Sequence, residues 1–124
     1  TVAYSDGHMQ VMSASMMGPG DSLVVVSNSG RTRDLMDAID IARKHGATTI
    51  AITCSGSPLA SAAHIHLAAD HPEGFDKYSP MTSRLMHLTV IDVLATVVAL
   101  RLDSAQLLPR LKDMKQNLRA KRYA

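Results

Sequence analysis

The chain has 124 residues, which favours a single globular domain, because one hydrophobic core typically takes about 100–200 residues. Its residues are 46% hydrophobic and 19% charged, and these proportions exclude a disordered polar segment. A dehydrogenase with separate dinucleotide and substrate domains would not fit in this length, nor would most two-domain kinases. A single cysteine, Cys54, excludes an internal disulfide and favours a reducing compartment, so we expect the cytoplasm.

The charges are unevenly distributed along this chain, and its hydrophobic residues include many methionines and few aromatic residues. Residues 101–124 carry seven basic and two acidic side chains, although the net charge of the whole chain is only +2. So small a net charge does not argue for nucleic-acid binding. We expect the basic tail to be a solvated helix face, with contact to DNA phosphates or a neighbouring subunit as the alternative. Eight methionines, one phenylalanine and no tryptophan predict a core of aliphatic side chains and methionine.

The predicted elements alternate between strands and helices. Extended backbone is favoured at residues 1–4, helices are predicted over residues 8–17, 32–45, 59–63, 83–102 and 104–122, strands over residues 22–27, 48–53 and 64–68, and a loop over residues 70–80. Asp6 is placed to cap the first helix, and Gly46 follows the second as a C-terminal cap. The run SLVVVS at residues 22–27 is continuous and β-branched, which is typical of a strand buried on both faces.

The predicted helix over residues 83–102 is apolar on nearly every side. Arg84, His87 and Asp92 interrupt it, so it lacks the run of about 18 apolar residues that a membrane span needs. A helix that is apolar all round must be covered all round, so we expect it to be buried in a core or between subunits. This pattern favours a homodimer or higher homo-oligomer and argues against a membrane.

The order of the elements indicates the fold class. Strands that alternate with helices predict an α/β fold, a doubly wound and mostly parallel sheet with flanking helices. In such sheets, ligands bind beyond the carboxyl ends of the strands. The segment SNSGRT at residues 27–32 lies at such an end, between a predicted strand and a predicted helix.

The composition of this segment suits a phosphate group. It has three hydroxyl side chains, and the free N–H groups and positive dipole of the helix start lie beside them. Gly30 allows close approach of the backbone, and Arg31 adds positive charge. The sequence therefore predicts a phosphate site, with a helix start capped by Ser29 as the alternative.

Other ligand motifs are missing from the sequence. There is no GxxxxGK[ST] and no GxGxxG, so neither a nucleoside triphosphate nor a dinucleotide is indicated. A loop rich in hydroxyl groups and without lysine suits one phosphate monoester on a small molecule. We expect no cofactor and no metal, because His64 and His66, even with Cys54, lack the ligand spacing of a metal site.

Four phrases of the sequence resemble a known family. GDSLVVVSNSGRT from residue 20, GATTIAIT from residue 46 and SPLA from residue 57 resemble, in this order, the sugar-isomerase (SIS) domain. SRLMHLTVIDVLA from residue 83 is similar to the SIS domains of RpiR-type bacterial transcription regulators. The resemblance covers essentially the whole chain and implies a flavodoxin-like parallel sheet that binds a phosphosugar.

The expected ligand contacts are Ser27, Asn28, Ser29, Gly30, Arg31, Thr32, Ser55, Lys77 and Arg84. The resemblance implies that the hydroxyl groups of the 27–32 segment bind phosphate, with amide or backbone contacts from Asn28 and Gly30. It also implies that the loop holding Ser55 lines the other end of the sugar. Lys77 and Arg84 suit, by their charge, a carboxylate of an acidic sugar phosphate.

The resemblance also implies a biological role. We expect the effector domain of a cytoplasmic repressor of sugar catabolism, with 2-keto-3-deoxy-6-phosphogluconate of the Entner–Doudoroff route as effector. Members of the family carry an earlier strand with a first serine loop, and the regulators an N-terminal helix-turn-helix that binds DNA. We expect all three to be absent from these 124 residues, which do not begin with Met.

Two other functions stay open. An aldose–ketose isomerase of the same fold needs a base such as Glu or His. Glu73, the only Glu in the sequence, and the imidazoles of His71 and His87 stand in no obviously catalytic frame. A dimerisation module built on the apolar helix is the third interpretation.

Overall fold

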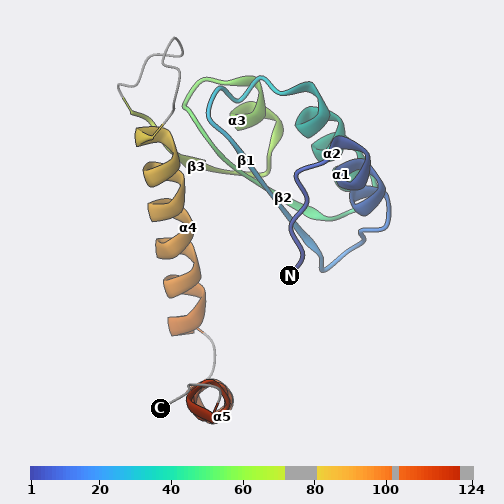
Figure 1. Cartoon of the computed structure of the whole chain (residues 1–124). Coiled ribbons are helices and arrows are strands. Elements are labelled where there is room, and N and C mark those ends of the chain that lie inside the picture. Colours follow the sequence, from blue (N-terminus) through green and yellow to red (C-terminus); the bar gives the residue numbers. More distant parts are fainter. Residues whose placement is uncertain (72–80, 102–103, 121–124) are drawn as a thin grey trace. The chain divides into compact units, whose positions relative to one another are not determined.

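The computed structural model describes residues 1–71, 81–101 and 104–120. Its elements in chain order are α1 (Gly7–Ser15), β1 (Ser22–Ser27), α2 (Arg33–Lys44), β2 (Thr48–Thr53), α3 (Pro58–Ala62), β3 (Ile65–Ala68), α4 (Thr82–Arg101) and α5 (Ser104–Ala120) (Figure 1). Every predicted helix and strand is present. The extended start is wrong as a strand, because residues 1–4 form no strand. The chain forms two compact parts, Thr1–Val90 and Ile91–Ala124.

The three strands form a parallel sheet in the order β1-β2-β3. Ser27 pairs with Thr53, and Thr53 pairs with Ala68. The carboxyl ends of all three strands therefore lie level at one edge of the sheet. The expected α/β class, a parallel sheet with flanking helices, is confirmed.

Helices α1, α2 and α3 lie on the same side of the sheet (Figure 1). Val25 and Ala51 of the sheet pack against Ile39 of α2 and Leu59 of α3. A second cluster joins α1 to α2 and consists of Ala14, Ala38, Ala42 and Ala47. Small side chains here let the two helices approach closely.

The prediction of a methionine-rich core is wrong. The fully buried hydrophobic residues are mostly alanine, with a few Ile, Leu and Val. Met12 of α1 and Met16, which directly follows this helix, are instead 62% and 87% exposed. Alanine fills the contact between α1 and α2, and Met17 and Met36 pack against the two core clusters while only partly buried.

Strand β1 is buried on one face only, which corrects the prediction for residues 22–27. Leu23 and Val25 face the helices, whereas Val24 and Val26 on the other face are 43% and 39% exposed. Helices α1, α2 and α3 pack on the face of Leu23 and Val25, so they leave Val24 and Val26 uncovered. The central strand β2 is better covered, and its Ala51 and Ile52 are fully buried.

Two helix caps follow the prediction. The Met9 N–H donates to the Asp6 carboxylate at 3.1 Å, so Asp6 is the N-cap of α1. Gly46 follows the end of α2 with a φ of +84°, a left-handed conformation that glycine adopts at low cost. Both caps were readable from the sequence because they depend on local chemistry alone.

Helix α4 exposes most of its apolar surface. Ser83 is its only buried side chain among the described residues, so burial of this helix between subunits stays a prediction. Of the described residues, only α4 forms a helix long and apolar enough to cross a membrane, judged by length and composition. The few charges of α4 therefore do not exclude a membrane span, contrary to our expectation. Buried helices of soluble proteins have similar compositions.

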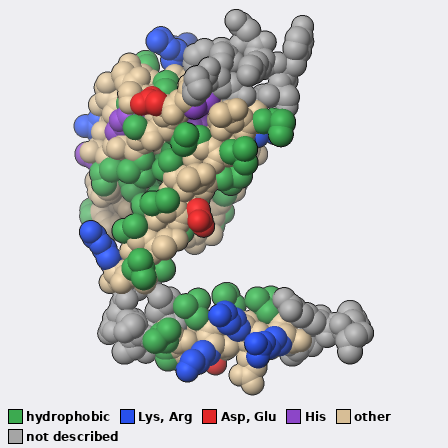
Figure 2. Space-filling model, turned by 90° about the vertical axis from the view of Figure 1, so that its left-hand side faces the viewer, with side chains coloured by type: hydrophobic (Ala, Val, Ile, Leu, Met, Phe, Trp, Pro, Cys, Tyr) green, Lys and Arg blue, Asp and Glu red, His purple; other side chains and the backbone are tan. Residues whose placement is uncertain are grey.

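Helix α5 is amphipathic. Leu111, Met114 and Leu118 are 38%, 51% and 57% exposed along one stripe. Hydrophobic side chains lie beside Lys and Arg on its surface (Figure 2). The described basic side chains of α5 are exposed within the chain, and the choice between a solvated face and contact with DNA or a subunit stays a prediction.

Candidate functional site

The loop at residues 27–32 connects β1 to α2 at the carboxyl edge of the sheet. The Ser27 Oγ lies 3.2 Å from the Thr32 Oγ1, and it accepts a hydrogen bond from the Gly30 N–H at 3.1 Å. Ser27 is buried, so one hydroxyl braces both the middle and the end of the loop. The structure thus brings together the two predicted hydroxyl groups that lie furthest apart in the motif.

The start of α2 has no side-chain cap. The N-cap residue is Thr32, and its side chain makes no capping hydrogen bond. The alternative that Ser29 caps this helix is wrong, because the Ser29 Oγ accepts from the Arg31 N–H at 3.3 Å. The first N–H groups of a helix have no partner within the helix, so the start of α2 keeps donors and a positive dipole for an anion.

Gly30 is required by two features of the loop. Its φ is +61°, which a residue with a side chain adopts only at a cost. A Cβ at this position would overlap the Ser57 side chain and lie 2.6 Å from the Thr53 Oγ1. Only glycine therefore lets the loop rest directly on the end of β2 and the start of α3.

Asn28 contributes an acceptor without a partner. Its Oδ1 is buried and has no hydrogen-bond partner among the described residues. Most buried polar atoms in folded proteins are hydrogen-bonded. The Asn28 Oδ1 therefore has the capacity to accept a hydrogen bond from a donor outside the described residues.

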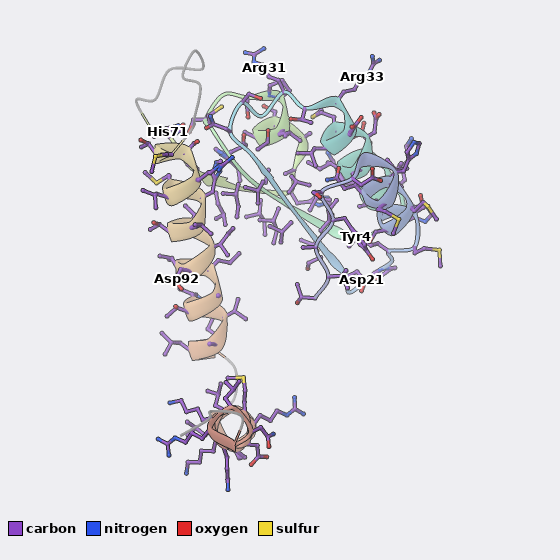
Figure 3. All side chains as sticks on the ribbon, in the orientation of Figure 1. Tyr4, Asp21, Arg31, Arg33, His71 and Asp92 are labelled. Atoms are coloured by element: carbon purple, nitrogen blue, oxygen red, sulfur yellow. The ribbon has the colours of Figure 1, made fainter. Side chains whose placement is uncertain are left out.

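Arg31 and Arg33 extend from the loop and the first residue of α2 away from the sheet (Figure 3). Both side chains are exposed. They place positive charge around the loop without covering it.

Ser55 lies in the loop after β2 and is bound by Asp70. The Ser55 N–H donates to Asp70 Oδ1 at 2.7 Å, and the Ser55 hydroxyl donates to Asp70 Oδ2 at 2.6 Å. The side-chain and backbone hydrogen bonds from Ser55 lower the pKa of the Asp70 carboxyl, and His66 and His71 lower that pKa a little further. The role of Ser55 as a ligand contact stays a prediction.

Sequence reasoning missed Asp70. A carboxylate placed directly after the third strand was the available signal, because the carboxyl ends of parallel strands share one edge. Lys77 lies outside the described residues. Arg84 is exposed on the first turn of α4, and no described hydrogen bond or ion pair joins it to the 27–32 loop.

The loop after β2 also contacts the 27–32 loop directly. The Cys54 thiol donates to the Ser29 carbonyl at 3.4 Å, and the Leu59 N–H donates to the Gly30 carbonyl at 3.1 Å. Cys54 is half-buried. The thiol and backbone contacts place the two loops side by side at the carboxyl edge of the sheet.

The histidines before and within β3 bind protein groups, His64 at the amino end of β2 and His66 at its carboxyl end. The His64 Nδ1 accepts from the Thr49 N–H at 3.1 Å, and the His66 Nε2 lies 3.0 Å from the Thr53 carbonyl oxygen. Within the described part of the chain, no group of three or more His, Cys, Asp or Glu side chains is placed to hold a metal ion.

Comparison with known proteins gives consistent relatives. The chain is 46% identical to the HTH-type transcriptional regulator HexR of Pseudomonas aeruginosa, over 98% of this chain and 42% of HexR. It is 46% identical to the bifunctional protein glk of Burkholderia thailandensis, over 82% of this chain and 16% of that protein. The structure of the Vibrio vulnificus NanR protein complexed with ManNAc-6P matches with a TM-score of 0.85 and 25% identity, over 99% of this chain and 46% of NanR.

These relatives are longer than the chain, which spans less than half the length of HexR and of the solved NanR chain. The SIS domain family matches residues 1–97. That match contains the parallel sheet and both loops described above. The chain therefore belongs to the SIS domain family.

Proposed function

We propose that this chain is the effector-binding and dimerisation domain of a bacterial transcriptional regulator that senses a phosphosugar. The observation that carries the proposal is the arrangement of the Ser27 and Thr32 hydroxyls, 3.2 Å apart, at a helix start without a side-chain cap. The names of the relatives support it, because HexR is a transcriptional regulator and NanR was solved with a sugar phosphate.

The phosphate is held by hydrogen bonds from short side chains and backbone. In this proposal, its oxygens accept from the hydroxyls of Ser29 and Thr32 and from the first N–H groups of α2. Ser27 stabilises the conformation of the 27–32 loop, since its Oγ already accepts a hydrogen bond from the Gly30 N–H. A helix start suits an anion because its N–H groups and dipole both favour negative charge.

The rest of the effector lies over the neighbouring loops in this account. The buried Asn28 Oδ1 accepts a sugar hydroxyl, and Ser55 lines the far end of the sugar. Lys77 and Arg84 bind a carboxylate. An acidic sugar phosphate fits this set of groups, and we propose 2-keto-3-deoxy-6-phosphogluconate.

A further strand would complete the site. Among the described strands, β1 has one unpaired edge, and α1 lies on the same side of the sheet as α2 and α3 (Figure 1). Connections between parallel strands are almost always right-handed, so a strand that precedes α1 in this arrangement pairs with the free edge of β1. Its loop would then lie beside Ser27.

The remaining parts of the proposal concern the whole protein. The regulator acts as a repressor of sugar catabolism in the cytoplasm, without a cofactor and without catalysis. It binds DNA through a helix-turn-helix outside these residues. It forms homodimers or higher homo-oligomers in which the apolar surface of α4 is covered.

A thermal-shift panel on the purified protein, expressed from its full reading frame, tests the effector. A ligand at about 100 times its dissociation constant adds about 2.7 kcal/mol to the free energy of unfolding. We expect 2-keto-3-deoxy-6-phosphogluconate to raise the melting temperature, and Ser29→Ala or Thr32→Ala to abolish the rise. Ser15→Ala and Thr89→Ala, whose hydroxyls bond their own helices, are matched controls that keep it.

Two results would contradict this function. If no sugar phosphate raises the melting temperature, the proposed role as a phosphosugar sensor is wrong. Turnover of a sugar phosphate by the purified protein would favour the aldose–ketose isomerase instead.

A further inference from the structure

We propose that Asp70 is a positioning residue for the ligand site, and that it acts through the loop after β2 to hold the 27–32 loop in its binding geometry. This inference rests on the proposed function, because the geometry that Asp70 maintains is that of the 27–32 loop, which is called the phosphate loop below. Asp70 itself does not touch the phosphate in this account.

The first step is the attachment of Ser55 to Asp70. Both carboxylate oxygens are used, one for the Ser55 N–H at 2.7 Å and one for its hydroxyl at 2.6 Å. Hydrogen bonds to an ionised acceptor are short and stronger than neutral ones. The pair joins the loop after β2 to the end of β3, 15 residues further along the chain.

The end of β3 is itself fixed to β2. The Ala69 N–H donates to the Thr53 carbonyl at 3.0 Å, and the His66 Nε2 lies 3.0 Å from the same oxygen. Asp70 directly follows Ala69, which is buried. The carboxylate is therefore anchored on the sheet and does not belong to a freely moving loop.

The second step leads from Ser55 to the phosphate loop. Its neighbour Cys54 donates to the Ser29 carbonyl at 3.4 Å, and Ser57 lies against Gly30, where a Cβ would overlap it. The Leu59 N–H donates to the Gly30 carbonyl at 3.1 Å. The loop after β2 is thus the surface on which the middle of the phosphate loop rests.

The consequence is a mechanical dependence of the phosphate loop on Asp70. Without the carboxylate, the segment from Cys54 to Ser57 loses its attachment to β3, and its contacts with Ser29 and Gly30 become less well defined. The hydroxyl of Ser29 and the start of α2 then spend less time in the geometry that binds phosphate.

Cys54 offers a direct readout, because it is half-buried against the Ser29 carbonyl and its alkylation can be followed in its own peptide by mass spectrometry. In the purified full-reading-frame protein without ligand, we expect Asp70→Ala to raise the rate of Cys54 alkylation by iodoacetamide about fivefold, as loss of a charge-assisted hydrogen bond implies. Asp70→Asn keeps one acceptor oxygen, so its rate is intermediate. Asp40→Asn, at an exposed carboxylate on α2, is the control and leaves the rate unchanged.

The affinity for 2-keto-3-deoxy-6-phosphogluconate, measured by calorimetry at a temperature where every variant is folded, completes the test. We expect Asp70→Ala to weaken binding about fivefold, and the ligand to slow alkylation in the wild type. An unchanged alkylation rate in Asp70→Ala overturns the inference. So does a lower melting temperature with unchanged affinity, because that pattern shows a structural role only.

The two proposals fail in different ways. If the wild type binds no sugar phosphate, the proposed function fails, while the alkylation rates without ligand still report whether Asp70 holds the loop. If the wild type binds and Asp70→Ala binds equally well, the positioning role fails and the proposed function stands.

Discussion

The hydroxyl groups of Ser27 and Thr32 lie 3.2 Å apart across a loop whose middle residue, Gly30, donates its N–H to Ser27. This contact closes the loop on itself before any ligand arrives. A preformed loop loses less conformational entropy on binding, so the site is prepared for a small anion.

Gly30 is the most sensitive position of the loop. We expect Gly30→Ala to lower the free energy of unfolding by about 2–4 kcal/mol, because the left-handed backbone and overpacking both cost energy. Gly20→Ala is a matched control, since Gly20 also has a positive φ of 95° but has nothing within 4 Å of a Cβ. It should cost only about 1–2 kcal/mol. Urea unfolding measures both, and equal losses would contradict the close approach at Gly30.

Ser27 and Ser29 have different roles despite their shared motif. Ser27→Ala removes the acceptor of the buried Gly30 N–H, so we expect it to cost about 1–3 kcal/mol of stability. Ser29→Ala removes a half-buried hydroxyl at the rim of the site, so it should change stability little and abolish effector binding. Paired unfolding and calorimetric titrations separate the two effects. The reverse assignment would show that Ser29 braces the loop.

His87 makes stability depend on pH. Burial lowers the pKa of its imidazole, and the neighbouring His71 lowers it further. The unfolded chain has a pKa of about 6.5 for this group and therefore takes up more protons as the pH falls. The contribution of His87 to the free energy of unfolding is therefore complete above the unfolded-state pKa. It is lost as the pH falls through the lowered pKa of the folded state.

His87→Gln tests this dependence. We expect the decline in stability between about pH 7 and 5 to become shallower in this variant. His8→Gln on the exposed face of α1 is the control and keeps the wild-type slope. Identical slopes for wild type and His87→Gln would show that other groups set the pH response.

The exposed apolar side chains of α4 predict an oligomer interface. Val93 and Val97 are one helical turn apart and 57% and 42% exposed. We expect the double variant Val93→Lys with Val97→Lys to dissociate the oligomer, as measured by light scattering after gel filtration. The urea midpoint of the monomer, measured by a separate unfolding titration, should change little. Arg84→Lys is a conservative control on the same helix. A double variant that stays oligomeric would place the interface elsewhere.

The sequence predicted the parts of the fold that depend on local patterns. The strands, the caps at Asp6 and Gly46, and the 27–32 loop all follow from residue type and spacing. It did not reveal that Val24 and Val26 are partly exposed, because the burial of a side chain depends on which elements cover that face of the strand. The bond between Ser55 and Asp70 was missed for the same reason, since only the paired strands bring these residues together.

The composition misled us about the core for a physical reason. Eight methionines suggested a methionine-filled interior, yet Ala14, Ala38 and Ala42 fill the contact between α1 and α2. A count of residue types does not show which face of a helix carries them. The spacing of Ala38 and Ala42, four residues apart in α2, was the better guide.

The measurement that tests the central claim most directly is a two-dimensional amide NMR titration of the isotopically labelled protein with 2-keto-3-deoxy-6-phosphogluconate. If the phosphate binds at the start of α2, the amide resonances of residues 29–35 shift most, and Thr32→Ala suppresses those shifts. If these resonances stay in place while the ligand is bound, or if the shifts map to another surface, the 27–32 loop is not the phosphosugar site.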